Sequence, residues 1–316
     1  MRTWWFAFWV GVMSLLAVPA GASTMPETIT LTYVKSPFNL QNIVMREQRL
    51  LEKAFANDGV RIEWRVINSG AQQAQALTAG SLDVSTVMNT ASFLMATGAG
   101  APITIISGVA RPSEVFALVS KPGVSWKIAD LKGKTVVGSK GTVLHQMLVV
   151  ALQKAGLTMG DIRFVNMDPA SAMTAILTGK ADAGLLAANL IIKAQAAGAR
   201  VMSTATGLVK PNLVMVARED FVKAYPEAVK RIVKTQHETL AWIEAHQQEA
   251  LTIGAKAQDI SIEAAQSLYQ WSHFYNRLTP DDIAGMKDDE AFLKANAMMQ
   301  HSVEIQTHIA PIAIAP

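Results

Sequence analysis

The chain contains no cysteine in 316 residues. This absence excludes disulfide bonds, catalytic thiols, zinc thiolates and iron–sulfur clusters. It also excludes attachment to a lipid through an N-terminal cysteine. An exported protein of this composition folds without disulfides, so its stability depends on packed cores.

Catalytic and metal-binding motifs are lacking as well. The sequence has neither HExxH nor GxSxG, and its six histidines form no close set of metal ligands. We therefore expect no enzyme activity, no metal and no cofactor. Lys and Arg exceed Asp and Glu by only three and are scattered, with no aromatic residues interleaved. Nucleic-acid binding therefore has little support.

One long apolar stretch without charge stands at the N-terminus. Residues 4–18 follow Arg2 and precede Ala20-Gly21-Ala22, an A-x-A cleavage site. This pattern predicts a secretory signal peptide over residues 1–22. The alternative is an uncleaved anchor, but an apolar run of about 15 residues falls short of the roughly 20 that span a membrane. We expect a free, monomeric periplasmic protein of residues 23–316.

Two stretches repeat each other at an offset of 99 residues. Residues 69–84 align without a gap on residues 168–183, so that Gly80 matches Gly179 and Asp83 matches Asp182. Each stretch reads as a helix, a glycine stop, an aspartate turn and a short apolar strand. The repetition of the aspartates indicates a role in the turn rather than in catalysis. Two copies of one α/β unit predict two similar lobes with a ligand cleft between them.

Strands and helices alternate over the first two thirds of the chain, which predicts mainly parallel sheets flanked by helices. We expect lobe I over residues 23–110 and 215–316 and lobe II over residues 111–214. Two apolar strands, residues 115–120 and 213–217, are expected to cross between the lobes as a hinge. Helices over 227–251, 262–273 and 280–295 are expected to pack on lobe I. The predicted fold is thus α/β and two-lobed.

Loops at the carboxyl ends of the strands are where ligands bind in such sheets, and helix N-termini there favour anions. Five loops supply the candidate ligand-binding residues. In chain order these are Phe38; Ser69 and Gly70; Asn89 and Thr90; Ser139, Lys140, Gly141 and Thr142; and Ala188 and Asn189. The 139–142 loop can hold a sulfonate, nitrate or carboxylate through backbone N–H groups, hydroxyls and a cation.

Each candidate also has a structural alternative. The Ser, Thr and Asn side chains can simply cap the helices that follow them, and Phe38 can staple one. Lys140 can be an exposed side chain in a capping turn. His145 is expected on the surface rather than in the cleft. Arg111, at the start of the hinge, is expected to pair with a carboxylate such as Glu114 rather than with a ligand.

Two motifs carry a family resemblance. ALTAGSLDV (residues 76–84) follows a strand with Trp64 and the loop Ser69-Gly70, and DLKGKTVVGSKGT (residues 130–142) opens lobe II. With them the chain resembles the periplasmic solute-binding proteins of ABC importers, of the nitrate/sulfonate/taurine type, over nearly all of residues 23–316. The resemblance implies that the lobes close around a ligand and that the closed form docks on a membrane permease.

The resemblance carries over to residues 69–70, 89–90, 139–142 and 188–189. Many relatives have an aromatic or acidic residue in the last loop, where this chain has Ala187-Ala188. The departure favours a larger or more apolar ligand. The leading hypothesis is a binding protein for a small organic anion such as a sulfonate. The alternatives are a bilobal enzyme related to pyrimidine-precursor synthases, and a ligand sensor without a transport role.

Overall fold

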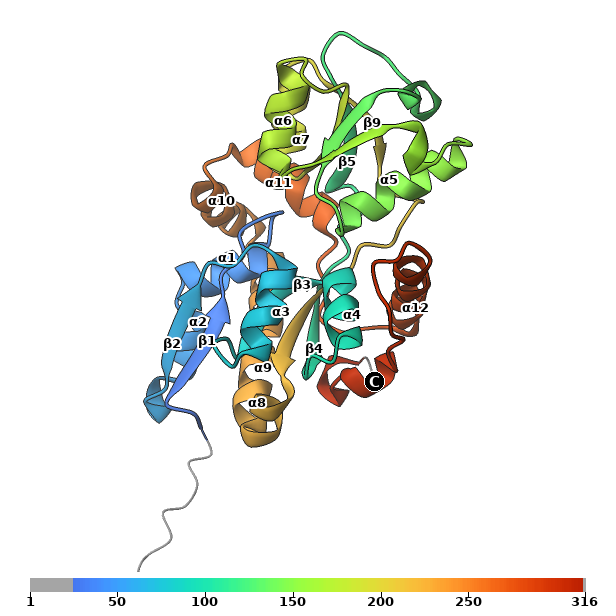
Figure 1. Cartoon of the computed structure of the whole chain (residues 1–316). Coiled ribbons are helices and arrows are strands. Elements are labelled where there is room, and N and C mark those ends of the chain that lie inside the picture. The colour runs from blue at the N-terminus through green and yellow to red at the C-terminus, as the bar shows by residue number, and fades with distance from the viewer. Residues whose placement is uncertain (1–24, 315–316) are drawn as a thin grey trace, which may run out of the picture.

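Two lobes, each built on a five-stranded sheet, form the molecule (Figure 1). The structure, a computed structural model, describes residues 25–314, and the predicted signal peptide lies outside the described residues. The strands of lobe I are β1 (Thr28–Thr32), β2 (Arg61–Arg65), β3 (Val84–Asn89), β4 (Ile103–Ala110) and β10 (Leu213–Arg218). Those of lobe II are β5 (Phe116–Ser120), β6 (Thr135–Gly138), β7 (Arg163–Asn166), β8 (Ala183–Ala187) and β9 (Arg200–Thr204).

Helices flank both sheets, as the alternating pattern predicts. Lobe II carries α5 (Val143–Lys154), α6 (Pro169–Leu177) and α7 (Asn189–Ala196). Lobe I carries α1 (Leu40–Glu47), α2 (Leu50–Ala54), α3 (Gly70–Thr78), α4 (Thr90–Gly98), α8 (Glu219–Ala224), α9 (Pro226–Ala245), α10 (Gln247–Gln258), α11 (Ile262–Ser272) and α12 (Pro280–Ala295). Helix α11 packs on α10 and also touches α7 of lobe II.

The two sheets have the same topology. Their strand orders are β2-β1-β3-β10-β4 and β7-β6-β8-β5-β9. In each sheet one strand runs antiparallel to both neighbours, β10 between β3 and β4 and β5 between β8 and β9. The strands that bear the sequence repeat, β3 and β8, occupy the same place. The repeat therefore marks two copies of one α/β unit.

The repeated aspartates make equivalent contacts in the two lobes. Each carboxylate accepts a hydrogen bond from a backbone N–H of the first parallel strand of its lobe and pairs with a cation at the end of the antiparallel strand. The partners are Thr30 N (2.8 Å) and Arg218 (2.8 Å) for Asp83, and Thr135 N (3.0 Å) and Lys121 (2.8 Å) for Asp182. These contacts confirm that Asp83 and Asp182 are structural residues.

The crossings between the lobes differ from the prediction. The segments expected to cross are strands, but β5 lies wholly in the sheet of lobe II and β10 wholly in that of lobe I. Residues 111–115 and 205–212 make the two crossings, and neither contains a helix or strand. A strand needs a neighbouring strand as ladder partner for its backbone groups, and the crossing segments have none.

The C-terminal third completes lobe I. The helix expected over residues 227–251 breaks at His246 (φ −128°, ψ 44°) into α9 and α10. Helix α12 begins with a capping box in which Thr279 and Asp282 satisfy each other's backbone N–H groups. The apolar tail runs beside β4, where Ala310 N donates to Ile105 O over 2.9 Å.

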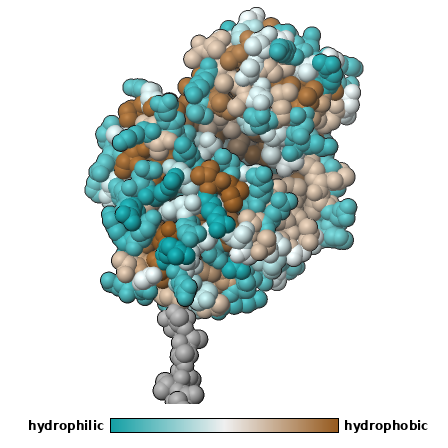
Figure 2. Space-filling model, turned by 60° about the vertical axis from the view of Figure 1, so that its left-hand side comes forward, coloured by the Kyte–Doolittle hydropathy of each residue, from teal (hydrophilic) through white to brown (hydrophobic). Residues whose placement is uncertain are grey.

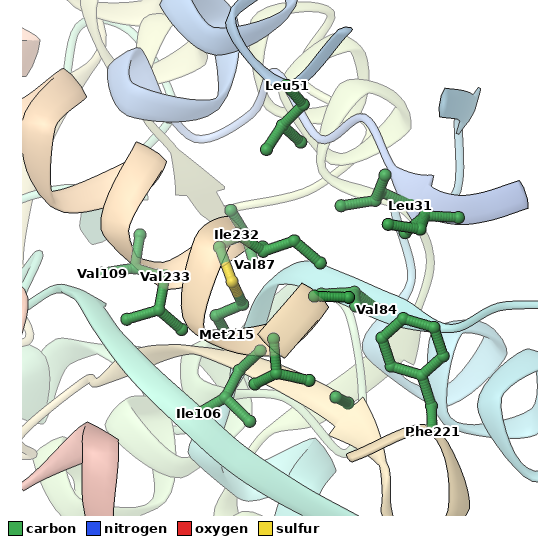
Figure 3. Close-up of a cluster of buried hydrophobic side chains, with 14 of the residues drawn as sticks. Leu31, Leu51, Val84, Val87, Ile106, Val109, Met215, Phe221, Ile232 and Val233 are labelled. Atoms are coloured by element: carbon green, nitrogen blue, oxygen red, sulfur yellow. The ribbon is translucent and has the colours of Figure 1, made fainter. Parts of the chain in front are cut away.

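The main core of lobe I lies between the sheet and helices α2, α8 and α9 (Figure 3). Its fully buried members come from both ends of the chain and include Leu31, Val84, Ile106, Met215, Phe221 and Ile232. Lobe II has separate clusters on the two faces of its sheet. Because each lobe has its own core, the lobes can move relative to one another without unfolding.

Candidate functional site

The carboxyl ends of the central strands face the other lobe, and the helices that begin there form the candidate site. In lobe I, Ser69 caps α3 by accepting from Gln72 N (3.5 Å), and Asn89 caps α4 by accepting from Ser92 N (2.8 Å). A Cβ placed on Gly70 would lie 2.5 Å from Ser92 Oγ. The predicted loops at 69–70 and 89–90 are thus in contact, and only glycine allows this approach.

The loop at Asn89-Thr90 also meets lobe II. Asn89 and Thr90 line a small cavity together with Phe116, Val143 and Gln146 of lobe II. Val143 is the first residue of α5, so the N-termini of α4 and α5 both lie beside this interlobe cavity. Figure 2 shows a hollow between the lobes, with hydrophobic residues on its floor and hydrophilic residues around it.

Asp289 of α12 also lines this cavity, and the sequence did not indicate it as a site residue. Its side chain is 6% exposed, and its two oxygens accept from Gln146 Nε2 (2.8 Å) and Thr90 Oγ1 (3.1 Å). Burial raises its pKa to about 6, although both hydrogen bonds act in the opposite direction. Asp289 lies some 200 residues from Thr90 in sequence, and no local pattern marks it.

The 139–142 loop uses its polar groups internally. Thr142 Oγ1 donates to Ser139 O (2.9 Å), and Ser139 Oγ donates to Met167 O (3.2 Å). Lys140 N donates to Asn166 Oδ1 (2.8 Å), while the Lys140 side chain is exposed. Gly141 has a left-handed backbone (φ +72°), which suits glycine. Thr142 stands at the N-cap of α5 but makes no capping bond through its side chain.

His145 is buried, and the expectation of a surface histidine is wrong. Its ring stacks on Phe164 with centroids 5.3 Å apart, and Nδ1 accepts from Gly141 N (3.4 Å). The pKa of His145 is lowered chiefly by its burial and, to a smaller extent, by the nearby charge of Lys140. A neutral His145 therefore supports the 139–142 loop from within lobe II.

Phe38 and Ala188 belong to one apolar cluster between the lobes and do not line the small cavity. Both are buried in one cluster that also holds Val115, and the Phe38 ring faces Gly254 of α10. Ala188 has an unusual backbone (φ 52°, ψ −128°) and donates its N–H to Val115 O over 2.9 Å. It also occupies the N-cap of α7, so Asn189 is the first helical residue and not a cap.

Arg111 does form a structural ion pair, but its partner differs from the expected one. Its guanidinium binds both oxygens of Asp282 (2.7 and 2.6 Å) and lies 3.5 Å from the centre of the Tyr275 ring. Glu114 instead contacts His273 (3.2 Å). The hydrogen bond from Arg111 and other donors keep the pKa of Asp282 low against the effect of its burial.

The second crossing is tied to the same cluster. Asn212 donates through Nδ2 to Asp282 Oδ1 (3.1 Å), and its Oδ1 accepts from the Tyr275 hydroxyl. Arg111 begins the first crossing, directly after β4, and Asn212 ends the second crossing, directly before β10. Asp282 therefore holds both crossings at the start of α12, beside a cavity of about 210 Å³.

Residues 25–314 contain neither a metal site nor a membrane-spanning helix. No group of three or more His, Asp or Glu in this range is arranged to hold a metal ion. Over the same range, every helix is too short or too polar to cross a bilayer.

Comparison with known proteins gives a family and a fold. The family model described as "NMT1/THI5 like" matches residues 54–250. A putative aliphatic sulfonates-binding protein of Escherichia coli strain K12 is 26% identical over 257 residues, covering 79% of this chain and 77% of that protein. The crystal structure of the periplasmic aliphatic sulphonate binding protein SsuA from Escherichia coli has a TM-score of 0.81 at 21% identity, covering 92% of this chain and 94% of that one.

The same fold also occurs in an enzyme. The desulfurization enzyme DSZB has a TM-score of 0.71 at 16% identity, covering 90% of this chain and 97% of that chain. At this identity the likeness shows the fold alone. The two-lobed α/β architecture predicted from the sequence is thereby confirmed.

Proposed function

Because the chain belongs to the NMT1/THI5-like family, we propose that it captures a small organic anion between its lobes and delivers it to an ABC permease. A protein named for sulfonate binding aligns with this chain over about three quarters of its length at 26% identity, and a solved structure of such a protein has the same fold over 94% of its chain. The proposed ligand is therefore of the sulfonate class. A periplasmic location, reached through cleavage of residues 1–22, is part of the proposal.

The N-termini of α4 and α5 at one small interlobe cavity are the observation that carries this proposal. The first turn of a helix offers unpaired N–H groups and a partial positive charge, which suit the oxygens of an anion. The N-terminus of α3 is packed beside that of α4. Closure of the lobes brings donors from both sides around one guest, so binding and closure are coupled.

The cavity has a volume of only about 10 Å³ in this structure, so the lobes must open to admit a ligand, and the side chains around it favour an organic rather than an inorganic anion. Phe116, Val143 and Leu213 present apolar side chains next to the polar groups of Asn89 and Thr90. An apolar body attached to a charged head matches such a lining.

An enzyme of the same fold is the alternative, and it rests on the likeness to DSZB alone. This chain has no cysteine to act as a nucleophile. The polar groups that meet at the interlobe cavity are amides, a hydroxyl and one buried carboxylate. Turnover of a sulfonate or sulfinate by the purified protein would favour the alternative.

A thermal-shift screen tests the proposal. The purified protein is melted with ethanesulfonate, taurine, a longer alkanesulfonate, nitrate, acetate and ethylamine. A ligand at 100 times its Kd stabilises the folded protein by about 2.7 kcal/mol and raises its melting temperature. We expect a rise with at least one sulfonate and none with ethylamine. A melting temperature that no anion changes, over millimolar concentrations, contradicts the proposal.

Native mass spectrometry of freshly purified protein complements the screen, because a ligand carried through purification identifies itself by mass. Small-angle scattering then tests closure. The radius of gyration is expected to fall when the stabilising ligand is added, and an unchanged value contradicts the coupling of binding to closure.

A further inference from the structure

Seven basic residues that are scattered in the sequence are gathered by the fold at one end of lobe II. These residues lie in four separate segments of the chain, the connection from β5 to β6 and the beginnings of β7, β8 and β9, so no cluster is visible in the sequence. They lie where the parallel strands of the lobe II sheet begin and where antiparallel β5 ends. We call this region the basic end of lobe II: Lys121, Lys127, Lys132, Lys134, Arg163, Lys180 and Arg200.

Trp126 lies at the centre of the basic end. The ammonium groups of Lys121 and Lys134 are 5.2 and 5.1 Å from the centre of its ring. Arg200 Nη1 donates to the neighbouring Ser125 Oγ over 3.1 Å. Figure 1 shows the loop between β5 and β6 projecting from the end of lobe II that is farthest from lobe I. The tryptophan and the cations therefore form one surface at the tip of the molecule.

Most of this charge is not neutralised locally. Lys121 pairs with Asp182 (2.8 Å), and Lys132 lies 3.9 Å from Asp161. Within residues 25–314, the other five cations have no carboxylate within 4.0 Å: Lys127, Lys134, Arg163, Lys180 and Arg200. Four of these five are exposed and Lys134 is half-buried. The basic end thus presents positive charge to its surroundings.

The charge difference extends over the whole molecule. Residues 116–204, from β5 to β9, contain ten Lys and Arg against four Asp and Glu. The described parts of lobe I, residues 25–110 and 213–314, contain 15 against 20. One lobe is therefore positive and the other negative, although the net charge of the chain is small. Such a separation orients a protein in the field of a charged surface.

We propose that the basic end of lobe II docks on the surface of an anionic lipid membrane. Cations spread around a partly exposed tryptophan suit a fluid layer of phosphate head groups, because such a layer requires charge density rather than matched geometry. The indole has an apolar body and a polar N–H, which suits the interface between head groups and acyl chains. A protein partner would need carboxylates matched to four separate segments.

This inference goes beyond the proposed function and does not depend on the ligand. The basic end lies at the amino ends of the strands of lobe II, whereas the interlobe cavity lies at their carboxyl ends. Docking there holds the protein at a membrane while its cleft stays accessible. The predicted consequence is a higher local concentration near membrane-bound partners.

Sedimentation with lipid vesicles tests the proposal. The purified protein is mixed with vesicles of phosphatidylcholine containing 30 mol% phosphatidylglycerol and with vesicles of phosphatidylcholine alone. We expect binding to the anionic vesicles at 20 mM salt and loss of binding at 500 mM, because salt screens exposed charges. Equal binding to both vesicles, or none to the anionic ones, overturns the proposal.

Charge-reversal variants locate the surface. Lys127→Glu, Lys180→Glu and Arg200→Glu together are expected to lower the partition coefficient for anionic vesicles at least tenfold. The matched control, Lys53→Glu, Lys230→Glu and Lys234→Glu, makes the same change in net charge on α2 and α9 of lobe I. It is expected to change the coefficient less than threefold. An equal loss in both variants means that net charge alone acts, and it overturns the proposal.

A second variant with neutral substitutions distinguishes a loss of binding from a loss of folding. The same three positions of lobe II changed to Gln are expected to give an intermediate partition coefficient, with an unchanged melting temperature. Binding of the parent protein to polyglutamate but not to anionic vesicles would identify an acidic polypeptide as the partner class instead, and would also overturn the proposal.

Discussion

Gln146 and Asp289 form a hydrogen bond between the lobes, with Gln146 Nε2 on α5 lying 2.8 Å from Asp289 Oδ1 on α12. The other oxygen of Asp289 accepts from Thr90 at the start of α4. One buried carboxylate thus joins the helix N-termini that we propose to hold an anion. Movement of the lobes has to break or re-form this contact.

Asp289 is predicted to make stability depend on pH. Its pKa in the folded protein is about 6, above the ordinary value of 3.8, chiefly because burial disfavours its charged form. Its contribution to the free energy of unfolding is therefore fully present below about pH 4 and is lost as the pH rises to 6. In Asp289→Asn, the uncharged amide can still accept a hydrogen bond from Gln146 through its oxygen and can donate one to the Thr90 hydroxyl through its nitrogen. At pH 7 we expect this variant to be more stable than the parent by up to about 3 kcal/mol.

Urea denaturation at several values between pH 4 and pH 7.5 checks this prediction. The parent and the variant should have similar stability at pH 4, and the difference should grow up to about pH 6. The affinity of the parent for an anion should rise as the pH falls through 6, since protonation removes a negative charge beside Thr90. A constant difference in stability across the range contradicts the assignment to Asp289.

Asn89→Asp is predicted to separate binding from stability. Aspartate caps a helix as well as asparagine does, so α4 should remain intact and the melting temperature should change by less than about 2 °C. The added negative charge at the floor of the cavity should weaken an anionic ligand at least tenfold. Isothermal titration calorimetry with the ligand from the thermal-shift screen measures the effect.

Ser261→Asp is the matched control for Asn89→Asp. Ser261 caps α11 by accepting from Ala264 N (3.1 Å), and it does not line the interlobe cavity. The same change of charge at a helix cap should leave affinity within twofold. An equal loss of affinity in the two variants would mean that the overall charge acts, rather than the site.

The repeated aspartates are predicted to contribute equally to stability. In Asp83→Asn and in Asp182→Asn, the amide oxygen can still accept the backbone N–H but the ion pair with Arg218 or Lys121 is lost. Both pairs are partly exposed, so we expect a loss of about 1 kcal/mol in each variant. The double variant should show the sum, because the sites lie in different lobes. Thermal denaturation measures the loss of stability, and titration with the ligand measures affinity. A loss of stability with unchanged affinity is the expected result for structural residues, and a large loss of affinity would contradict it.

Arg111→Lys is predicted to weaken the hinge. Lysine keeps the charge but cannot bind both oxygens of Asp282 or cover the Tyr275 ring in the same way. We expect a loss of roughly 1–2 kcal/mol in the free energy of unfolding. Lys210→Arg is a suitable control, because Lys210 pairs with Asp281 on the same helix but is largely exposed. A loss of similar size in the control would mean that the cluster around Asp282 has no special role.

The sequence predicted the repeated unit well because that unit is made by local interactions. Gly80 and Gly179 follow the ends of helices and have left-handed backbones (φ 71° and 73°). Glycine is the residue that favours this conformation, so these helix ends could be predicted from the sequence. Ser69 and Asn89 cap their helices, which was the structural alternative to ligand binding for both residues. A cap does not preclude a role in binding, so their place in the ligand site stays a prediction.

The predictions that were wrong concern contacts between segments that lie far apart in the sequence. His145 is buried because Phe164, from the neighbouring strand, covers its ring. Arg111 binds Asp282 rather than Glu114 because α12 returns to the hinge from the end of the chain. Phe38 and Ala188 are buried in one cluster that also contains residues of α10 and α11, from the C-terminal third of the chain. None of these environments has a signature in the local order of residues.

The sequence by itself determined the two α/β units, their helix ends and their aspartate turns, because hydrogen bonds within a few residues and the periodicity of apolar side chains suffice for these. Tertiary structure alone decided where charge is concentrated and where it is buried. The seven cations of the basic end come from four segments, and Asp289 acquires its raised pKa only when α12 lies between Thr90 and Gln146. The physical reason is that electrostatic energy depends on distances in space and on the exclusion of water, and both are set only after the chain has folded.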